Sequence, residues 1–209
     1  MATYTDPTTL NIAHKKFVTV QLVQALVDNP LAQQEVNSGA PWPTGVWHPY
    51  DSTEVGDGND GQHFDFATDG AVADPLTTPN FADKYEYRWH LNALKYNVNS
   101  TSDTVDVQAY NETAATWTTI LTINPVTANA DDRFFGYIIA QAPRILSTVH
   151  RFEFALHLDA NVATDQDFAG TATVFSATPF KVGNLRLNNS PNRNWNAGSA
   201  ELWRRRVSG

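Results

Sequence analysis

The sequence predicts a mainly β protein, an antiparallel β-sandwich of jelly-roll-like type with one short N-terminal helix and long loops. Two observations lead to this fold class. From residue 84 onwards, short segments that alternate apolar and polar residues recur, and polar turn clusters separate them. Thr, Asn, Asp and aromatic residues are frequent while Lys and Glu are scarce, which suits strands and turns better than helix surfaces. No helical pattern lies between these segments, which disfavours a parallel α/β sheet.

The N-terminal part is less regular. Residues 10–30 place apolar side chains at roughly helical spacing, and Pro30 stops a helix there, although the β-branched core of this segment also suits a strand. Residues 31–83 are rich in Gly, Pro, Asp and Asn, with short strands expected near 44–49 and 63–67. We therefore expect an arm and loop region over 1–83 that packs on a sandwich over 84–209, most simply as a single domain.

The strands of the second region follow from their alternation. The segment 149–158 is the clearest, because Phe152, Phe154, Leu156 and Leu158 share one face while Arg151, Glu153 and His157 share the other. Similar reasoning places Val105, Val107 and Ala109 inward. The remaining expected strands are 84–94, 103–110, 116–123, the apolar run 133–140, and one or two within 170–187.

Composition excludes several kinds of site. The chain has no cysteine, so disulfides, thiolate zinc sites and cysteine nucleophiles are ruled out. Its start lacks the pattern of a signal peptide and no apolar run is long enough to span a bilayer. We therefore expect a protein made in the cytoplasm without membrane contact. A net charge of −8 disfavours nucleic-acid binding, except through the C-terminal arginines.

The C-terminal stretch concentrates positive charge. Residues 181–209 hold six basic residues against one acid, although the chain is acidic overall. The last residues show no apolar periodicity, and such a tail needs a partner to be ordered. Arginine and tryptophan are enriched at interface hot spots. We therefore expect an extended basic tail that docks on an acidic face of a second copy, through Trp195, Trp203, Arg204, Arg205 and Arg206.

Aromatic side chains in loops offer an alternative, the stacking of sugar rings. The candidates for this role are Trp42, Trp47 and Tyr50. The stretch 105–123 also resembles a strand–turn–strand unit of galactose-binding-like and discoidin-like sandwiches. This alternative is a carbohydrate-binding or receptor-binding module.

A metal site has weak support. Asp57, Asn59, Asp60 and Asp65 are oxygen donors in a Gly-rich stretch, which calcium accepts. The EF-hand spacing fails, because Gly61 replaces the third donor and Thr68 stands where the closing Glu belongs. We expect no cofactor, with calcium as the only candidate.

Catalytic signatures are missing. There is no phosphate-binding loop and no serine nucleophile motif, and the Ser147–His150 neighbourhood lacks a group to orient the histidine. Glu86 and Glu153 are both expected to face outward from strands, which leaves a sandwich hydrolase as a second alternative. We expect that the protein is not an enzyme.

The whole profile resembles virion structural proteins of bacteriophage type, such as head-decoration, auxiliary capsid or tail proteins. The shared features are the cysteine-free sandwich rich in Thr, Asn and Ala, the extended ends and the missing active site. The resemblance implies a homo-oligomer in the virion that contacts other particle proteins and displays its loops outward.

Overall fold

The structure is a computed structural model that describes residues 45–50, 63–65, 71, 73–96, 104–124, 132–159, 165–190 and 194–207. The chain divides into two compact units, Met1–Val46 and Trp47–Gly209, and every strand among the described residues belongs to the second unit. The helix expected over 10–30 lies outside the described residues. Within the described residues there is no helix, hence none with the length and hydropathy of a membrane span.

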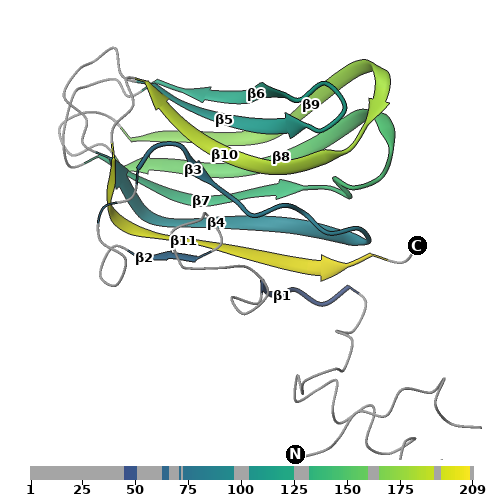
Figure 1. The fold of residues 1–209 in the computed structure, drawn as a ribbon. Coiled ribbons are helices and arrows are strands. Elements are labelled where there is room, and N and C mark those ends of the chain that lie inside the picture. Colours follow the sequence, from purple (N-terminus) through teal and green to yellow (C-terminus); the bar gives the residue numbers. More distant parts are fainter. Residues whose placement is uncertain are drawn as a thin grey trace, which may run out of the picture. The chain divides into compact units, whose positions relative to one another are not determined.

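The described strands form two antiparallel sheets, so the protein is mainly β as predicted (Figure 1). The seven-stranded sheet has the order β1-β11-β4-β7-β8-β9, and β2 also pairs with β11. Its strands are β1 (His48–Pro49), β2 (His63–Asp65), β4 (Tyr85–Tyr96), β7 (Arg133–Ala140), β8 (Ser147–Asp159), β9 (Gln166–Phe180) and β11 (Trp195–Arg206). The four-stranded sheet has the order β3-β10-β5-β6, with β3 (Leu76–Thr77), β5 (Thr104–Asn111), β6 (Thr116–Ile123) and β10 (Val182–Ser190).

One hydrophobic cluster draws on both sheets. In β5 the alternation is regular, and Val105, Val107 and Ala109 are buried as expected. In β8, Phe152 and Leu158 are buried in the same cluster. The largest buried side chains of the seven-stranded sheet include Trp89, Trp195, Tyr87 and Phe134. The face of this sheet that carries their neighbours in sequence, such as Arg88 and His90, is called the outer face below.

The strand β6 departs from the simple alternation. The sequence places Trp117, Thr119, Leu121 and Ile123 on one face, but Thr119 is exposed and Ile120 packs against the core. The cause is a bulge: Val107 pairs with Leu121 and the next residue, Gln108, pairs with Thr119. One extra residue in β6 therefore shifts the faces of its two halves.

The region 31–83 contributes three short strands, and two of them lie where short strands are expected, near 44–49 and 63–67. Its three short strands β1, β2 and β3 pair with β11, β11 and β10 respectively. Residues 47–83 thus supply edge pieces to both sheets and belong to the same compact unit as the other strands.

Candidate interaction surfaces

The expected basic tail is a strand inside the sheet. Residues 195–206 form β11, which pairs with β4 along one side and with β1 and β2 along the other (Figure 1). The prediction of an extended tail without partners in its own chain is therefore wrong. Trp195 is fully buried in the core cluster and is not available as a contact between chains.

Arg204 interrupts the apolar alternation that would otherwise indicate strand β11 in the sequence. Its position points inward, and its side chain is only 6% exposed. The guanidinium carbon lies 4.8 Å from the ring centre of Tyr50 and 4.7 Å from that of Tyr85. Two aromatic rings thus offset part of the cost of burying a cation. Ala200, Leu202 and Arg204 follow the alternation of a strand, but a charge at the last position hides it.

The other predicted interface residues of β11 contribute to the outer face. Trp203 and Arg205 are partly exposed there, and Arg206 is partly exposed at the strand's end. The indole nitrogen of Trp203 donates to Glu201 Oε2 at 2.9 Å. Arg205 forms an ion pair with Glu86. Trp203 and Arg205 are therefore held by neighbours on the same sheet, and both remain partly exposed on its outer face.

Arginine and aromatic side chains alternate across this outer face. The guanidinium of Arg88 lies 4.5 Å from the ring centre of Trp47 and 5.2 Å from that of Tyr137. The guanidinium of Arg205 lies 4.8 Å from Trp47. Two guanidinium groups thus already lie against the indole ring of Trp47, which makes that ring poorly suited to stack on a sugar.

His90 sits between these groups with an altered protonation equilibrium. Its ring meets Trp203 edge-on, with the centroids 6.0 Å apart. Burial and then the charge of Arg88 lower the pKa of His90, against a smaller opposing effect of Glu201. The imidazole is therefore neutral at pH 7, and the outer face carries its positive charge on arginines.

The remaining sugar-stacking candidates do not form a site. Tyr50 is buried between Tyr87 and Arg204, so the prediction that it contacts a ligand is wrong. Trp42 lies outside the described residues. The predicted calcium donors Asp57, Asn59 and Asp60 also lie outside them, and Asp65 is placed only as a backbone position in β2. Within the described ranges, no three acidic or histidine side chains gather as metal ligands do.

An exposed apolar patch is the feature that sequence reasoning missed. Large apolar side chains reach the surface where β7 connects to β8 and on the adjacent part of β9. Val149 pairs with Phe175 across β8 and β9, and Ile145 and Leu146 precede β8 in the connection. The patch consists of Ile145 (60% exposed), Leu146 (63%), Val149 (38%) and Phe175 (72%).

The turn that carries this patch is fixed to its surroundings. Arg144 forms ion pairs with Asp83 and Glu112, and Lys181 reaches the same Asp83 carboxylate at 3.2 Å. The Pro143 carbonyl accepts a hydrogen bond from Val182 N at 2.8 Å. Ile145 and Leu146 are thus presented to solvent by an anchored turn. A pair of apolar residues inside a proline-containing connection was the available sequence signal.

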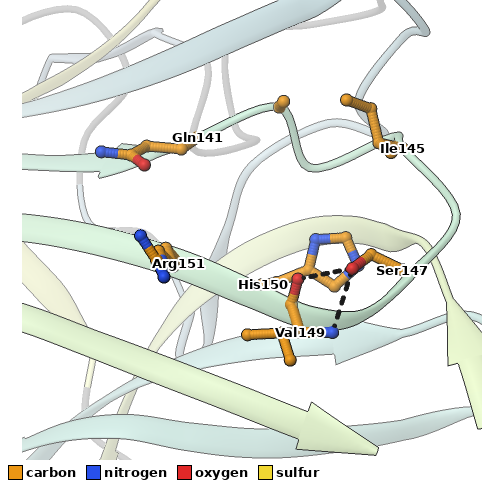
Figure 2. Close-up of a pocket in the computed structure, with 7 residues that line it drawn as sticks. Gln141, Ile145, Ser147, Val149, His150 and Arg151 are labelled. Carbon is orange, nitrogen blue, oxygen red and sulfur yellow. Dashed lines mark hydrogen bonds between the residues drawn. The ribbon is translucent and has the colours of Figure 1, made fainter.

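A shallow pocket lies beside the patch (Figure 2). Its volume is about 430 Å³, and Ile145, Ser147, Val149, His150 and Arg151 are among its lining residues. The hydroxyl of Ser147 exchanges hydrogen bonds with the backbone of Val149, at 2.9 and 3.1 Å. His150 Nε2 instead bonds the Phe180 carbonyl at 2.8 Å. Serine and histidine are therefore engaged separately, and this geometry does not activate the serine as a nucleophile.

A second hollow lies on the outer face over β7, β8 and β9. Its volume is about 280 Å³, and Phe135, Gly136, Ala155 and Ala169 line it. At its rim, His157 Nδ1 and Asp167 Oδ1 lie 2.8 Å apart. The hydrogen bond to Asp167 raises the pKa of His157. Both side chains are well exposed, so this is a surface ion pair of small energetic weight.

The two carboxylates considered for glycoside hydrolysis both have partners. Glu86 pairs with Arg205, and Glu153 accepts a hydrogen bond from Gln141. They lie on β4 and β8, with β7 between them. Neither side chain is singled out by the described geometry as an acid or a nucleophile.

Comparison with protein-family models, curated proteins and solved structures found no match to this chain.

Proposed function

We propose that this protein is a non-enzymatic structural component of a viral particle of bacteriophage type, a decoration, auxiliary capsid or tail protein that works as a homo-oligomer. In this proposal it contacts copies of itself and other particle proteins in the virion. We also propose that the two sheets form a jelly-roll-like β-sandwich, since both contribute to one hydrophobic cluster.

The observation that carries the assembly proposal is the apolar patch of Ile145, Leu146, Val149 and Phe175. Large apolar side chains that gather at the surface usually mark a contact with another molecule. The anchoring of their turn by Arg144 supports a preformed surface, because ordering costs are then met before association. This patch replaces the arginine tail as the expected contact, because Trp195 and Arg204 are buried in their own chain.

Sedimentation velocity of the full-length protein over a wide range of concentration and salt tests the proposal. We expect oligomers that persist as salt rises, because apolar contacts are not screened, whereas contacts between a basic tail and an acidic face weaken. Electron micrographs of the concentrated protein should show particles or arrays of regular size. A monomer under all conditions contradicts the proposal.

The patch itself is tested by the double substitution Ile145→Asn and Leu146→Asn. We expect the oligomer to weaken at least about tenfold, because two exposed apolar contacts are lost. Ala114→Asn, in the exposed turn between β5 and β6, is the matched control and should leave assembly unchanged.

Carbohydrate binding is a second candidate, and one observation favours it. Trp203 is partly exposed on the outer face, and its orientation is fixed by Glu201 and His90. A fixed indole beside polar side chains can stack on a sugar ring while neighbours bond its hydroxyls. A glycan array should then show binding that Trp203→Ala abolishes and Trp117→Ala, on the other sheet, preserves. The absence of any bound glycan would remove this candidate.

A further inference from the structure

The strand β9 leaves one side of its backbone open. It pairs with β8 continuously along residues 166–175 and, after a register shift, again at Phe180, and it is the last strand in the order of the seven-stranded sheet. Among the described strands, none is hydrogen-bonded along its other side, although β6 of the four-stranded sheet approaches it. Over residues 166–175 a row of backbone N–H and C=O groups therefore has no strand partner on that side and can accept a further strand, whereas the Pro179 carbonyl near the C-terminal end accepts a hydrogen bond from Thr113 Oγ1.

The composition of β9 does not protect this edge. Natural edge strands are blunted by charges, prolines or bulges. Here Asp167 stands near the start and Pro179 near the end, while residues 168–178 contain neither a charge nor a proline. This neutral stretch belongs to a chain with a net charge of −8. The uncharged composition of residues 168–178 is therefore typical of a strand that has a neighbour on both sides.

The exposed side chains of β9 also suit pairing. Phe175 is the most exposed of the large apolar side chains described, and Thr171 and Thr173 are exposed on the same outer face. Aromatic and β-branched residues form the favourable cross-strand pairs of antiparallel sheets. An isolated subunit would expose these residues on an open edge, which is an aggregation hazard.

We propose that the open edge of β9 pairs antiparallel with β9 of a second copy across a two-fold axis, joining two seven-stranded sheets into one. The inference rests on the proposed assembly function and names its interface. Symmetric self-pairing is the natural geometry for an isologous contact. It satisfies both open backbone rows at once.

Charges at the ends of β9 favour the second copy in this orientation. Asp165 and Asp167 are exposed at the N-terminal end, and Lys181 follows the C-terminal end. Antiparallel self-pairing brings the acidic end of one copy to the basic end of the other, whereas parallel pairing sets like charges side by side. Lys181 contacts Asp83 but remains one-third exposed, so a second carboxylate can approach it.

A specific register follows from these constraints. With Thr173 on the two-fold axis, Asp165 of one copy lies near the C-terminal end of β9 of the other copy, which Lys181 follows; because the register of β9 shifts after Phe175, the exact pairing is specified only over the regular part of the strand. In the same register Thr171 lies opposite Phe175, a β-branched residue facing an aromatic one. The neutral interior pairs only with itself, so no like charges meet.

The absence of cysteine makes a cross-linking experiment clean. Thr173→Cys in the full-length protein should form a disulfide-linked dimer under mild oxidation, because opposed residues of antiparallel strands are close enough for a disulfide. Thr119→Cys is the control, since Thr119 is exposed on β6, the edge strand of the other sheet. We expect cross-linking of Thr173→Cys to be faster by at least about tenfold. Equal rates, or no dimer from Thr173→Cys, overturn the proposed register.

A charge placed on the edge tests the interface independently of register. Phe175→Lys should weaken self-association at least about tenfold in sedimentation equilibrium, and Thr119→Lys should not. Circular dichroism checks that both lysine variants fold. If Phe175→Lys does not fold, the cross-linking rates of the cysteine variants test the β9 interface instead. The β9 interface is overturned if the wild-type protein forms an oligomer, Phe175→Lys does not weaken it and Thr173→Cys does not cross-link it. In that case the proposal that the protein assembles still holds. A wild-type monomer at all concentrations overturns both proposals.

Discussion

Asp74 shows how burial sets the chemistry of one residue. This half-buried carboxylate precedes β3, and its Oδ1 accepts a hydrogen bond from Asn189 N at 2.9 Å. Desolvation raises the pKa of Asp74 to about 6, against the opposing effects of that hydrogen bond, Trp195 and Arg186. The folded protein therefore holds this proton more tightly than the unfolded chain.

The sign of the resulting pH dependence is fixed. Because the folded pKa of about 6 exceeds the unfolded value of 3.8, the contribution of Asp74 to stability is greatest below pH 4 and is lost as the pH rises to about 6. Asp74→Asn should raise the free energy of unfolding above pH 6 by about 1–2 kcal/mol, after allowance for solvent screening, and change it little at pH 4. Urea denaturation from pH 4 to 8 measures this. Asp159→Asn, an exposed carboxylate, is the control, and an equal gain at pH 4 and pH 8 contradicts the assignment.

At the scale of elements, β4 and β11 meet through irregular backbone. Gly198 has a φ of +80°, and a Cβ there would lie 2.2 Å from the carbonyl oxygen of Ala93. Ala93 itself has a φ of 50°, and the register shifts on both sides of this contact. Paired bulges therefore bring the two backbones closer than any side chain allows, and glycine is required.

Gly198→Ala should consequently lower the free energy of unfolding by at least about 2 kcal/mol, because positive φ is strained and the new Cβ clashes with backbone. Thermal and urea denaturation measure the change. Gly170→Ala is the matched control, since its Cβ would meet only Phe154 at 3.7 Å, an ordinary contact. A loss at Gly170 as large as that at Gly198 would show that the close approach is not the cause.

At the scale of the whole molecule, the C-terminal segment is part of the core. β11 has strand partners on both sides and contributes Trp195, Ala200 and Leu202 to the hydrophobic cluster. Removal of β11 would leave β1, β2 and β4 without the strand that pairs with all three of them. The strand that carries the C-terminal basic residues is therefore required for the fold, whatever those residues contact.

A chain that ends at residue 194 should fail to fold cooperatively, because a central strand and the fully buried Trp195 are lost. A chain that ends at residue 207, just beyond β11, is the control and should keep the stability of the full protein. Circular dichroism and tryptophan fluorescence during urea denaturation distinguish the two. If the chain that ends at residue 194 is folded and stable, residues 195–209 are not required for the fold and the prediction is wrong.

The mainly β, antiparallel character of the chain is readable from its sequence, because side chains alternate between faces every second residue wherever a sheet has one buried face. That rule placed Val105, Val107, Ala109, Phe152 and Leu158 in the core. It failed at β6, where a bulge changes the face, and at β11, where Arg204 occupies an inward position. Periodicity carries no information on these local exceptions.

Which surfaces are available follows from the packing of the strands and not from the sequence pattern. The sequence does not show that two tyrosines flank Arg204, or that Val149 and Phe175 meet across β8 and β9 beside the anchored turn. Each of these contacts joins residues far apart in the chain, so their energies depend on strand order and register. The candidate contact surfaces are therefore the apolar patch and the unpaired edge of β9 and not the C-terminal arginines, because burial is a property of the whole packed molecule.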